Sequence, residues 1–123
     1  AGGIGITVFR SMLRFIRDER LPYDVTLVYS NRDRESAAFL DELQELEQAI
    51  PGFRVVLTMT DDPEWDGESR RIDPDLLRDH VGDLGTLRFL VAGPPTMAEA
   101  VADGLKAAGV SEEHVLADKF SGY

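Results

Sequence analysis

The chain begins with the stretch Ala1-Gly2-Gly3-Ile4-Gly5-Ile6-Thr7, a glycine-rich turn that leads directly into an amphipathic segment. Glycine has no Cβ, so the backbone N–H groups of such a turn can approach a phosphate, and the positive end of the following helix favours an anion there. The turn matches the first two glycines of a dinucleotide fingerprint, whereas Val8 occupies the place of the third small residue. The stretch favours a nucleotide site, with a plain turn as the alternative.

Strands and helices alternate along the rest of the chain. Short β-rich runs predict strands over residues 25–29, 54–59, 87–91 and 115–117, and apolar residues at helical spacing predict helices over 7–19, 36–49, 73–82 and 94–108. The polar stretch 61–72 is predicted as a loop or lid. Because strands that alternate with helices of about 10–15 residues form parallel sheets, we expect one α/β domain over residues 1–123, a doubly wound, Rossmann-like parallel sheet with strand order 3-2-1-4-5.

The first strand of that order is absent from the chain. In a dinucleotide-binding unit the glycine turn follows a buried parallel strand at the centre of the sheet, and here the turn comes first. The strand should lie between residues 25–29 and 87–91. Three possibilities stay open: the domain is N-terminally truncated, a second copy completes the sheet as a homodimer, or the two inner strands pair directly.

Composition limits the classes of function. The net charge of −10 repels nucleic acid, and the absence of cysteine excludes disulfides and thiolate chemistry. No apolar stretch approaches the ~20 residues that span a bilayer and no leader is present, so we expect a cytoplasmic protein, although its parent could be attached to a membrane protein. We predict no metal site. A solvated loop is favoured over an ion site for Asp61, Asp62 and Glu64, and His80 and His114 have no evident third ligand.

Two further segments end predicted strands. Tyr29-Ser30-Asn31-Arg32 occupies the position that meets the adenosine ribose in nucleotide-binding α/β sheets. Ser30 and Arg32 suit a 2′-phosphate, but Asp33 comes next and leaves both NADPH and NADH open. In Gly93-Pro94-Pro95, glycine permits close approach and the prolines begin a helix whose N–H groups point into the crevice. Each segment also has a purely structural reading as the end of a strand or the start of a helix.

Taken together and in this order, the segments resemble the NAD(P)-binding domain of the ferredoxin–NADP⁺ reductase superfamily of flavin-dependent reductases. The resemblance is carried by Gly2 to Thr7, Ser11-Met12, Tyr29 to Arg32, Gly93 to Pro95 and Asp118 to Tyr123, and it covers nearly the whole chain. It implies a Rossmann-like fold that binds NADP or NAD. The chain departs from the family pattern at Val8, where the family has proline, and at Ala92, where the family has a cysteine beside the nicotinamide C4.

The resemblance also implies roles for residues by their position. The cofactor-binding residues would be Gly3, Gly5, Thr7, Ser30, Arg32, Gly93, Pro94, Met97 and Phe120. Gly3, Gly5 and Thr7 would cradle the pyrophosphate and the nicotinamide ribose, and Ser30 and Arg32 would meet the adenosine ribose or its phosphate. Gly93, Pro94 and Met97 would line the nicotinamide, and Phe120 would lie near the flavin ring. No catalytic residue is assigned, because Ala92 supplies no thiol.

The expected function is that of the nucleotide-binding domain of an FAD-dependent oxidoreductase, which passes a hydride from NAD(P)H to FAD and electrons on to an iron–sulfur, haem or other acceptor. FAD would be bound mainly by a domain that normally precedes this one, so this chain alone should bind nucleotide at most. Two alternatives stay open. One is a flavodoxin-like, non-enzymatic binding or regulatory module with Asp61-Asp62 at a strand end, and the other is an inactive fragment.

Overall fold

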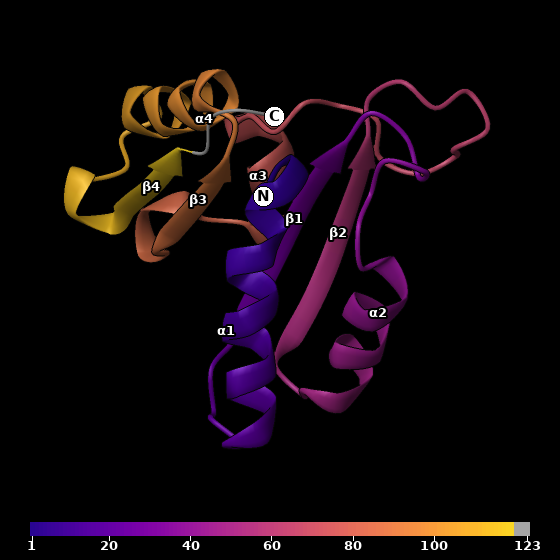
Figure 1. Cartoon of the computed structure of the whole chain (residues 1–123). Coiled ribbons are helices and arrows are strands. Elements are labelled where there is room, and N and C mark those ends of the chain that lie inside the picture. The colour runs from indigo at the N-terminus through magenta and orange to yellow at the C-terminus, as the bar shows by residue number, and fades with distance from the viewer. Residues whose placement is uncertain (120–123) are drawn as a thin grey trace.

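The computed structural model describes residues 1–119 and shows short parallel strands surrounded by helices (Figure 1). In chain order the elements are η1 (Gly3–Gly5), α1 (Ile6–Asp18), β1 (Val25–Asn31), α2 (Leu40–Ala49), β2 (Phe53–Met59), α3 (Pro74–Val81), η2 (Leu84–Thr86), β3 (Phe89–Gly93), α4 (Pro95–Ala107), η3 (Glu112–His114) and β4 (Val115–Lys119), where η marks a 3₁₀ turn. The alternation of strands and helices predicted from the sequence is confirmed.

The strands form two separate parallel pairs. β1 pairs with β2 in a register that sets Val25 opposite Phe53, and β3 pairs with β4 in a register that sets Phe89 opposite Val115. The arrowheads of both pairs point toward the top of Figure 1, so the carboxyl ends of the strands lie at one edge of the molecule. The α/β class with parallel strands is therefore confirmed.

Apolar side chains form a core layer on each face of the strands. On one face, α1 and α2 pack residues such as Leu43 against Tyr29 of β1. On the other face, α3 and α4 cover Val28 and Val91, with Leu76 fully buried among them. Tyr29 and Val28 belong to opposite layers because successive side chains of a strand point to opposite faces. Coverage on both faces explains why the strands read as continuous apolar runs.

Residues 1 and 2 connect the two strand pairs. The Ala1 carbonyl accepts the N–H of Ser30 at 2.8 Å, and Gly2 donates its N–H to the Ala92 carbonyl at 3.0 Å. Gly2 also forms a parallel bridge with Ser30. Strands β1 and β3 belong to different sheets, so the possibility that the two inner strands pair directly is wrong. The short segment Ala1–Gly2 lies between them instead.

Two predicted boundaries are corrected. The second helix begins at Leu40 rather than at residue 36, because Ser36 donates its N–H to the Asp33 carboxylate in a turn and Phe39 adopts a left-handed φ of 64°. The third strand runs over 89–93 rather than 87–91, since the 3₁₀ turn η2 over 84–86 is capped by Leu87 and the strand pairing starts only at Phe89. Both shifts come from local turns rather than from a different order of elements.

The predicted loop over 61–72 is present and is anchored to β2. Thr58 donates its hydroxyl to the Arg70 carbonyl at 2.5 Å, and Met59 donates its N–H to the Glu68 carbonyl at 3.0 Å. The Trp65 indole donates to the same Glu68 carbonyl at 2.9 Å, so this side chain anchors the loop. Among the described residues, none of the helices has the length and apolar character required to cross a bilayer. The cytoplasmic location stays a prediction.

Candidate functional site

The glycine turn packs tightly against the end of β3. Gly5, the cap residue of α1, donates its N–H to the Gly2 carbonyl at 3.0 Å. A Cβ on Gly5 would lie 2.3 Å from the Ala92 carbonyl oxygen, a distance at which no side chain fits. Gly3 has a φ of 52°, in the left-handed region that favours glycine. Gly5 is therefore the residue that permits the close approach of α1 and β3.

The end of β1 lies beside the same turn. Ser30 is half-buried and bonded through its N–H to the Ala1 carbonyl, while Arg32 is exposed. Since Gly2 forms a parallel bridge with Ser30 and donates its N–H to the Ala92 carbonyl, it joins the ends of β1 and β3. The structure thus brings together segments 3–7, 30–32 and 92–97, which are far apart in the chain, at the edge where parallel sheets bind ligands.

The start of α4 completes this edge. Gly93 is buried, and a Cβ there would lie 2.7 Å from Met97 Sδ. A Cβ on Gly2 would lie 3.2 Å from the same sulfur atom, so Met97 packs beside the glycine turn. Pro94 caps the helix and Pro95 is its first residue, where the missing N–H removes no helical hydrogen bond.

Two helices present their positive ends here without a compensating acid. The first turns of α1 and α4 contain no acidic residue, whereas those of α2 and α3 do. The N–H groups of a first helical turn have no partner within the helix, so they are available to an anion. In a chain with a net charge of −10, this edge supplies the local attraction that an anionic nucleotide requires.

The arginines that follow β1 are paired with acids. An Arg32 Nη atom lies 3.5 Å from a carboxylate oxygen of Asp61, and Arg34 Nε lies 2.9 Å from Asp62. The hydrogen bond from Arg34 lowers the pKa of Asp62, and the same contact raises the pKa of Arg34. Hydrogen bonds from Ser36 lower the pKa of Asp33. Within residues 1–119, no three His, Cys, Asp or Glu side chains form a group that could hold a metal ion.

The sequence pattern does not single out Asn31, the last residue of β1. Its exposed fraction is 9%, and its Nδ2 atom has no hydrogen-bond partner among the residues that the structure describes. A buried donor without a partner costs about 1–3 kcal/mol, so such an atom calls for an explanation, for example a bound water, an ion or a functional role. The sequence shows an amide side chain at the end of a strand, but only the structure shows that its Nδ2 atom has no partner among the described residues.

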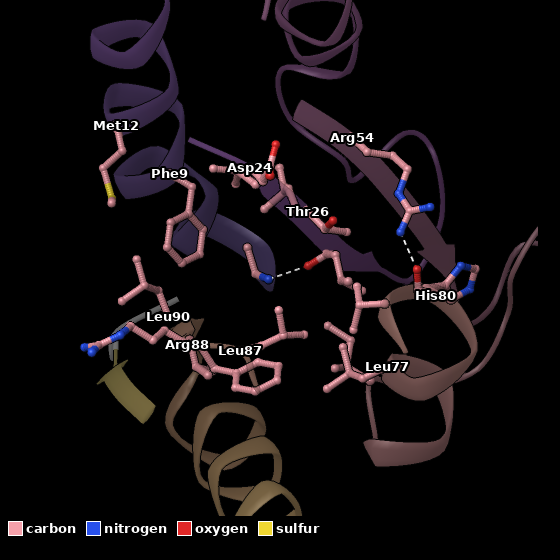
Figure 2. A pocket seen from close by; sticks show the side chains of 18 of the residues that line it. Phe9, Met12, Asp24, Thr26, Arg54, Leu77, His80, Leu87, Arg88 and Leu90 are labelled. Atoms are coloured by element: carbon pink, nitrogen blue, oxygen red, sulfur yellow. Dashed lines mark hydrogen bonds between the residues drawn. The ribbon is translucent and has the colours of Figure 1, made fainter. Parts of the chain in front are cut away.

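A cavity of about 480 Å³ lies between the two strand pairs (Figure 2). Its walls come from β1 (Leu27 and Val28), β3 (Leu90 and Val91), α1 (Phe9) and α3 (Leu77). Ala1 also lines the cavity, and its amino group donates to the Val28 carbonyl at 2.6 Å. The cavity is therefore in the layer of the strands, and Ala1, which precedes the glycines of the turn, is one of the residues that line it.

The remaining predicted site residues lie as follows. Thr7 is exposed in the first turn of α1, and Pro94 is half-buried at the start of α4. Ala92 is 1% exposed, and its carbonyl group accepts the N–H of Gly2. Because the residue is alanine, it supplies no thiol at the position where the family pattern has a cysteine. Phe120, predicted near the flavin, lies outside the described residues.

Comparison with known proteins identifies the class of this fold and site. Residues 1–103 match the family described as the oxidoreductase NAD-binding domain. A nitrate reductase [NADPH] of Emericella nidulans is 35% identical over 93% of this chain and 14% of its own length. The 2-halobenzoate 1,2-dioxygenase electron transfer component of Burkholderia cepacia is 32% identical over 98% of this chain and 36% of its own. The solved flavohem-like FAD/NAD-binding domain of nitric oxide dioxygenase from Vibrio cholerae O1 biovar El Tor superposes with a TM-score of 0.84 at 19% identity, over 98% of this chain and 49% of that one.

The chain therefore belongs to the oxidoreductase NAD-binding domain family. The sequence relatives are named as oxidoreductases or their electron transfer components, which agrees with the resemblance to the ferredoxin–NADP⁺ reductase superfamily. The likeness to the solved structure, at 19% identity, supports the fold. The chain spans about half or less of the length of these proteins.

Proposed function

We propose that this chain is the nicotinamide-nucleotide-binding domain of a larger FAD-dependent reductase. When bound, NAD(P)H would supply a hydride to FAD, and an iron–sulfur, haem or other centre would receive the electrons. The observation that carries the proposal is the meeting of the α1 and α4 N-termini, both without acids in their first turns, at a glycine turn in which Gly5 has no room for a Cβ.

The residues at this edge fit a dinucleotide. The backbone of Gly3, Gly5 and Thr7 would hold the pyrophosphate, Ser30 and Arg32 would meet the adenosine ribose, and Gly93, Pro94 and Met97 would line the nicotinamide. The fit rests on this chain's own geometry, since a side chain at Gly5 or Gly93 would occupy the space that the close approach requires. The contact of Phe120 with the flavin stays a prediction.

The FAD would be held mainly by a domain that precedes this one in the full-length protein. The solved relative combines FAD and NAD binding in a chain of which the present sequence covers 49%. A titration tests the function directly: NADH and NADPH are added anaerobically to the full-length protein while the flavin absorbance is followed. Bleaching with at least one nucleotide is expected, and the absence of bleaching with both would reject the proposal.

We further propose that the cavity between β1 and β3 holds a strand that precedes Ala1, which completes the order 3-2-1-4-5. The two observed pairs are the outer pairs of that order. The cavity lies in the strand layer and its walls are mostly aliphatic, and residues 25–28 and 87–91 flank it. A strand of about five apolar residues, at about 3.3 Å per residue, matches these flanking segments.

The surroundings of Ala1 support the same proposal. Its amino nitrogen is fully buried and donates to the Val28 carbonyl, and burial lowers the pKa of this amino group to about 5. A peptide N–H would make the same hydrogen bond without burying a charge, whereas an ammonium group is costly in this environment. The position therefore suits the middle of a chain that continues into the cavity.

A second copy of the chain is the alternative occupant of the cavity. The 123-residue chain can be compared with the same chain extended by the residues that precede it in its natural protein. If the strand is supplied upstream, the extended chain is monomeric by analytical ultracentrifugation and has the higher Tm. A 123-residue chain that is a tight dimer with an equal Tm would instead assign the cavity to a second copy.

A further inference from the structure

The end of β1 contains an unused hydrogen-bond donor. Asn31 is 9% exposed, and among the described residues its Nδ2 atom is without a partner, although the Asn31 carbonyl accepts the N–H of Thr60 at 3.0 Å. Asn31 directly follows Ser30, which is bridged to Gly2, so it lies next to the glycine turn. A neutral amide at this place can donate to a hydroxyl oxygen, and it occupies the strand end where related folds hold the adenosine ribose.

The cation that would bind a 2′-phosphate is already opposed by a carboxylate. Arg32 and Asp61 face each other across the ends of β1 and β2, with 3.5 Å between Nη and Oδ2. The Asp61 N–H also donates to the Arg32 carbonyl at 2.7 Å, so the backbone holds the two residues side by side. Both side chains are exposed, so a ligand at this strand end would meet both charges.

Arg34, the second arginine after β1, already forms ion pairs with other acids. Arg34 lies 2.9 Å from Asp62 and 3.8 Å from Glu64, and its guanidinium stacks over the Trp65 ring at 5.9 Å. Across segments 30–36 and 60–68 the sequence contains seven acids and two arginines. A phosphate brings a charge of about −1.5 to −2 to this excess of acids, whereas a ribose diol brings none.

We infer that this site selects an adenosine ribose without a 2′-phosphate, so that NADH is preferred over NADPH. Asn31 donates from Nδ2 to a ribose hydroxyl oxygen, and Asp61 disfavours the phosphate by pairing with Arg32 and by repulsion. The inference rests on the proposed function, because it assumes that a nicotinamide nucleotide binds at this edge. It makes Asp61 the specificity-determining residue, although Ser30 and Arg32 by themselves suit a phosphate.

Calorimetric titration of the full-length protein with NAD⁺ and NADP⁺ tests the inference. NAD⁺ is expected to bind at least about tenfold more tightly, and Asp61→Asn should shift the ratio of affinities about fivefold toward NADP⁺. Asp66→Asn is the matched control, because it removes the same charge from the same loop, and within residues 1–119 Arg32 forms its ion pair with Asp61 and not with Asp66. It should shift the ratio by less than about twofold.

Asn31→Ala tests the hydrogen bond. The variant should bind NAD⁺ about tenfold more weakly while its Tm is unchanged or higher, because the alanine removes a buried donor that has no partner in the described part of the chain. A lower Tm with unchanged NAD⁺ affinity would overturn the role of Asn31. Tighter binding of NADP⁺ by the wild type, or equal shifts for the two aspartate variants, would overturn the selectivity. Failure of both nucleotides to bind would reject the proposed function itself.

Discussion

The N-termini of the helices differ in how their positive ends are compensated. In α2, Asp41 and Glu42 lie in the first turn, and in α3 the Asp73 carboxylate accepts the Leu76 N–H at 2.8 Å with Asp75 beside it. The first turns of α1 and α4 contain no acid and no side-chain cap. The two uncompensated helix ends are the ones that meet at the glycine turn.

The difference shows how a protein with a net charge of −10 can attract a negatively charged ligand. Acids in the first turns of α2 and α3 compensate the positive ends of these helices, and in α3 the Asp73 carboxylate also caps a free N–H. Acids are absent from α1 and α4, so their N–H groups stay available at the edge where the strands end. Acids in the first turn are therefore found at α2 and α3, whereas the nucleotide binding that we propose lies at α1 and α4.

We expect the largest effect from Gly5→Val, which places a side chain where the N-terminus of α1 packs against β3. The added Cβ would lie 2.3 Å from the Ala92 carbonyl oxygen, so the α1 N-terminus must move. We expect a loss of about 3 kcal/mol in the free energy of unfolding and about 100-fold weaker nucleotide binding. Chemical denaturation and calorimetry measure the two quantities. Gly85→Ala is the control, because its Cβ would have its nearest neighbour at 3.4 Å, and equal effects of the two substitutions would contradict the role of Gly5.

Thr7→Glu converts the first turn of α1 into one that resembles α2. The new carboxylate should weaken nucleotide binding about tenfold through repulsion of the pyrophosphate, while it stabilises the helix by about 0.5 kcal/mol. Thr7→Gln separates charge from size, and Asp41→Asn in α2 should change only stability. Equal nucleotide affinities for Thr7→Glu and Thr7→Gln in a calorimetric titration would refute the electrostatic account of the α1 end.

Asp73→Ala sharpens the comparison from the other side. It removes the carboxylate that caps α3, so the free energy of unfolding should fall by about 1 kcal/mol. Nucleotide affinity should stay the same, since α3 does not contribute to the glycine turn edge. Urea denaturation gives the first quantity, and an affinity change above about threefold would show that the two kinds of helix end are coupled.

The smallest effect concerns the acid-rich loop after β2. The Arg70 guanidinium lowers the pKa of Glu68 from 4.5 to about 2. Because the folded-state pKa is depressed, the stabilisation is present above pH ~4.5 and is lost as the pH falls toward 2. Glu68→Gln should remove about 0.5 kcal/mol at neutral pH, since partly exposed ion pairs contribute little, and should flatten this part of the pH profile. An unchanged slope of Tm against pH between 5 and 2 would contradict the assignment.

Much of the fold and part of the site could be predicted from the sequence. Segments 3–7, 30–32 and 92–97 each adjoin the end of a strand or its expected position, and parallel strands share one carboxyl edge, so their meeting follows from the order of elements. The start of α2 could not be predicted, because the turn of Asp33 and the left-handed Phe39 interrupt a pattern that reads as helix. Helical spacing records which side chains face the core but not where the backbone begins to follow the helix.

The sequence by itself determined the class of fold, the position of the glycine turn and the absence of acids from two helix ends, because these depend on residue type and spacing along the chain. Only the tertiary structure decided that a Cβ at Gly5 would clash with the Ala92 carbonyl group of β3. It also decided that Asn31 has a donor unpaired within the described residues and that Asp61 opposes Arg32. Such facts depend on distances between segments that the chain brings together from afar, and no local pattern encodes them.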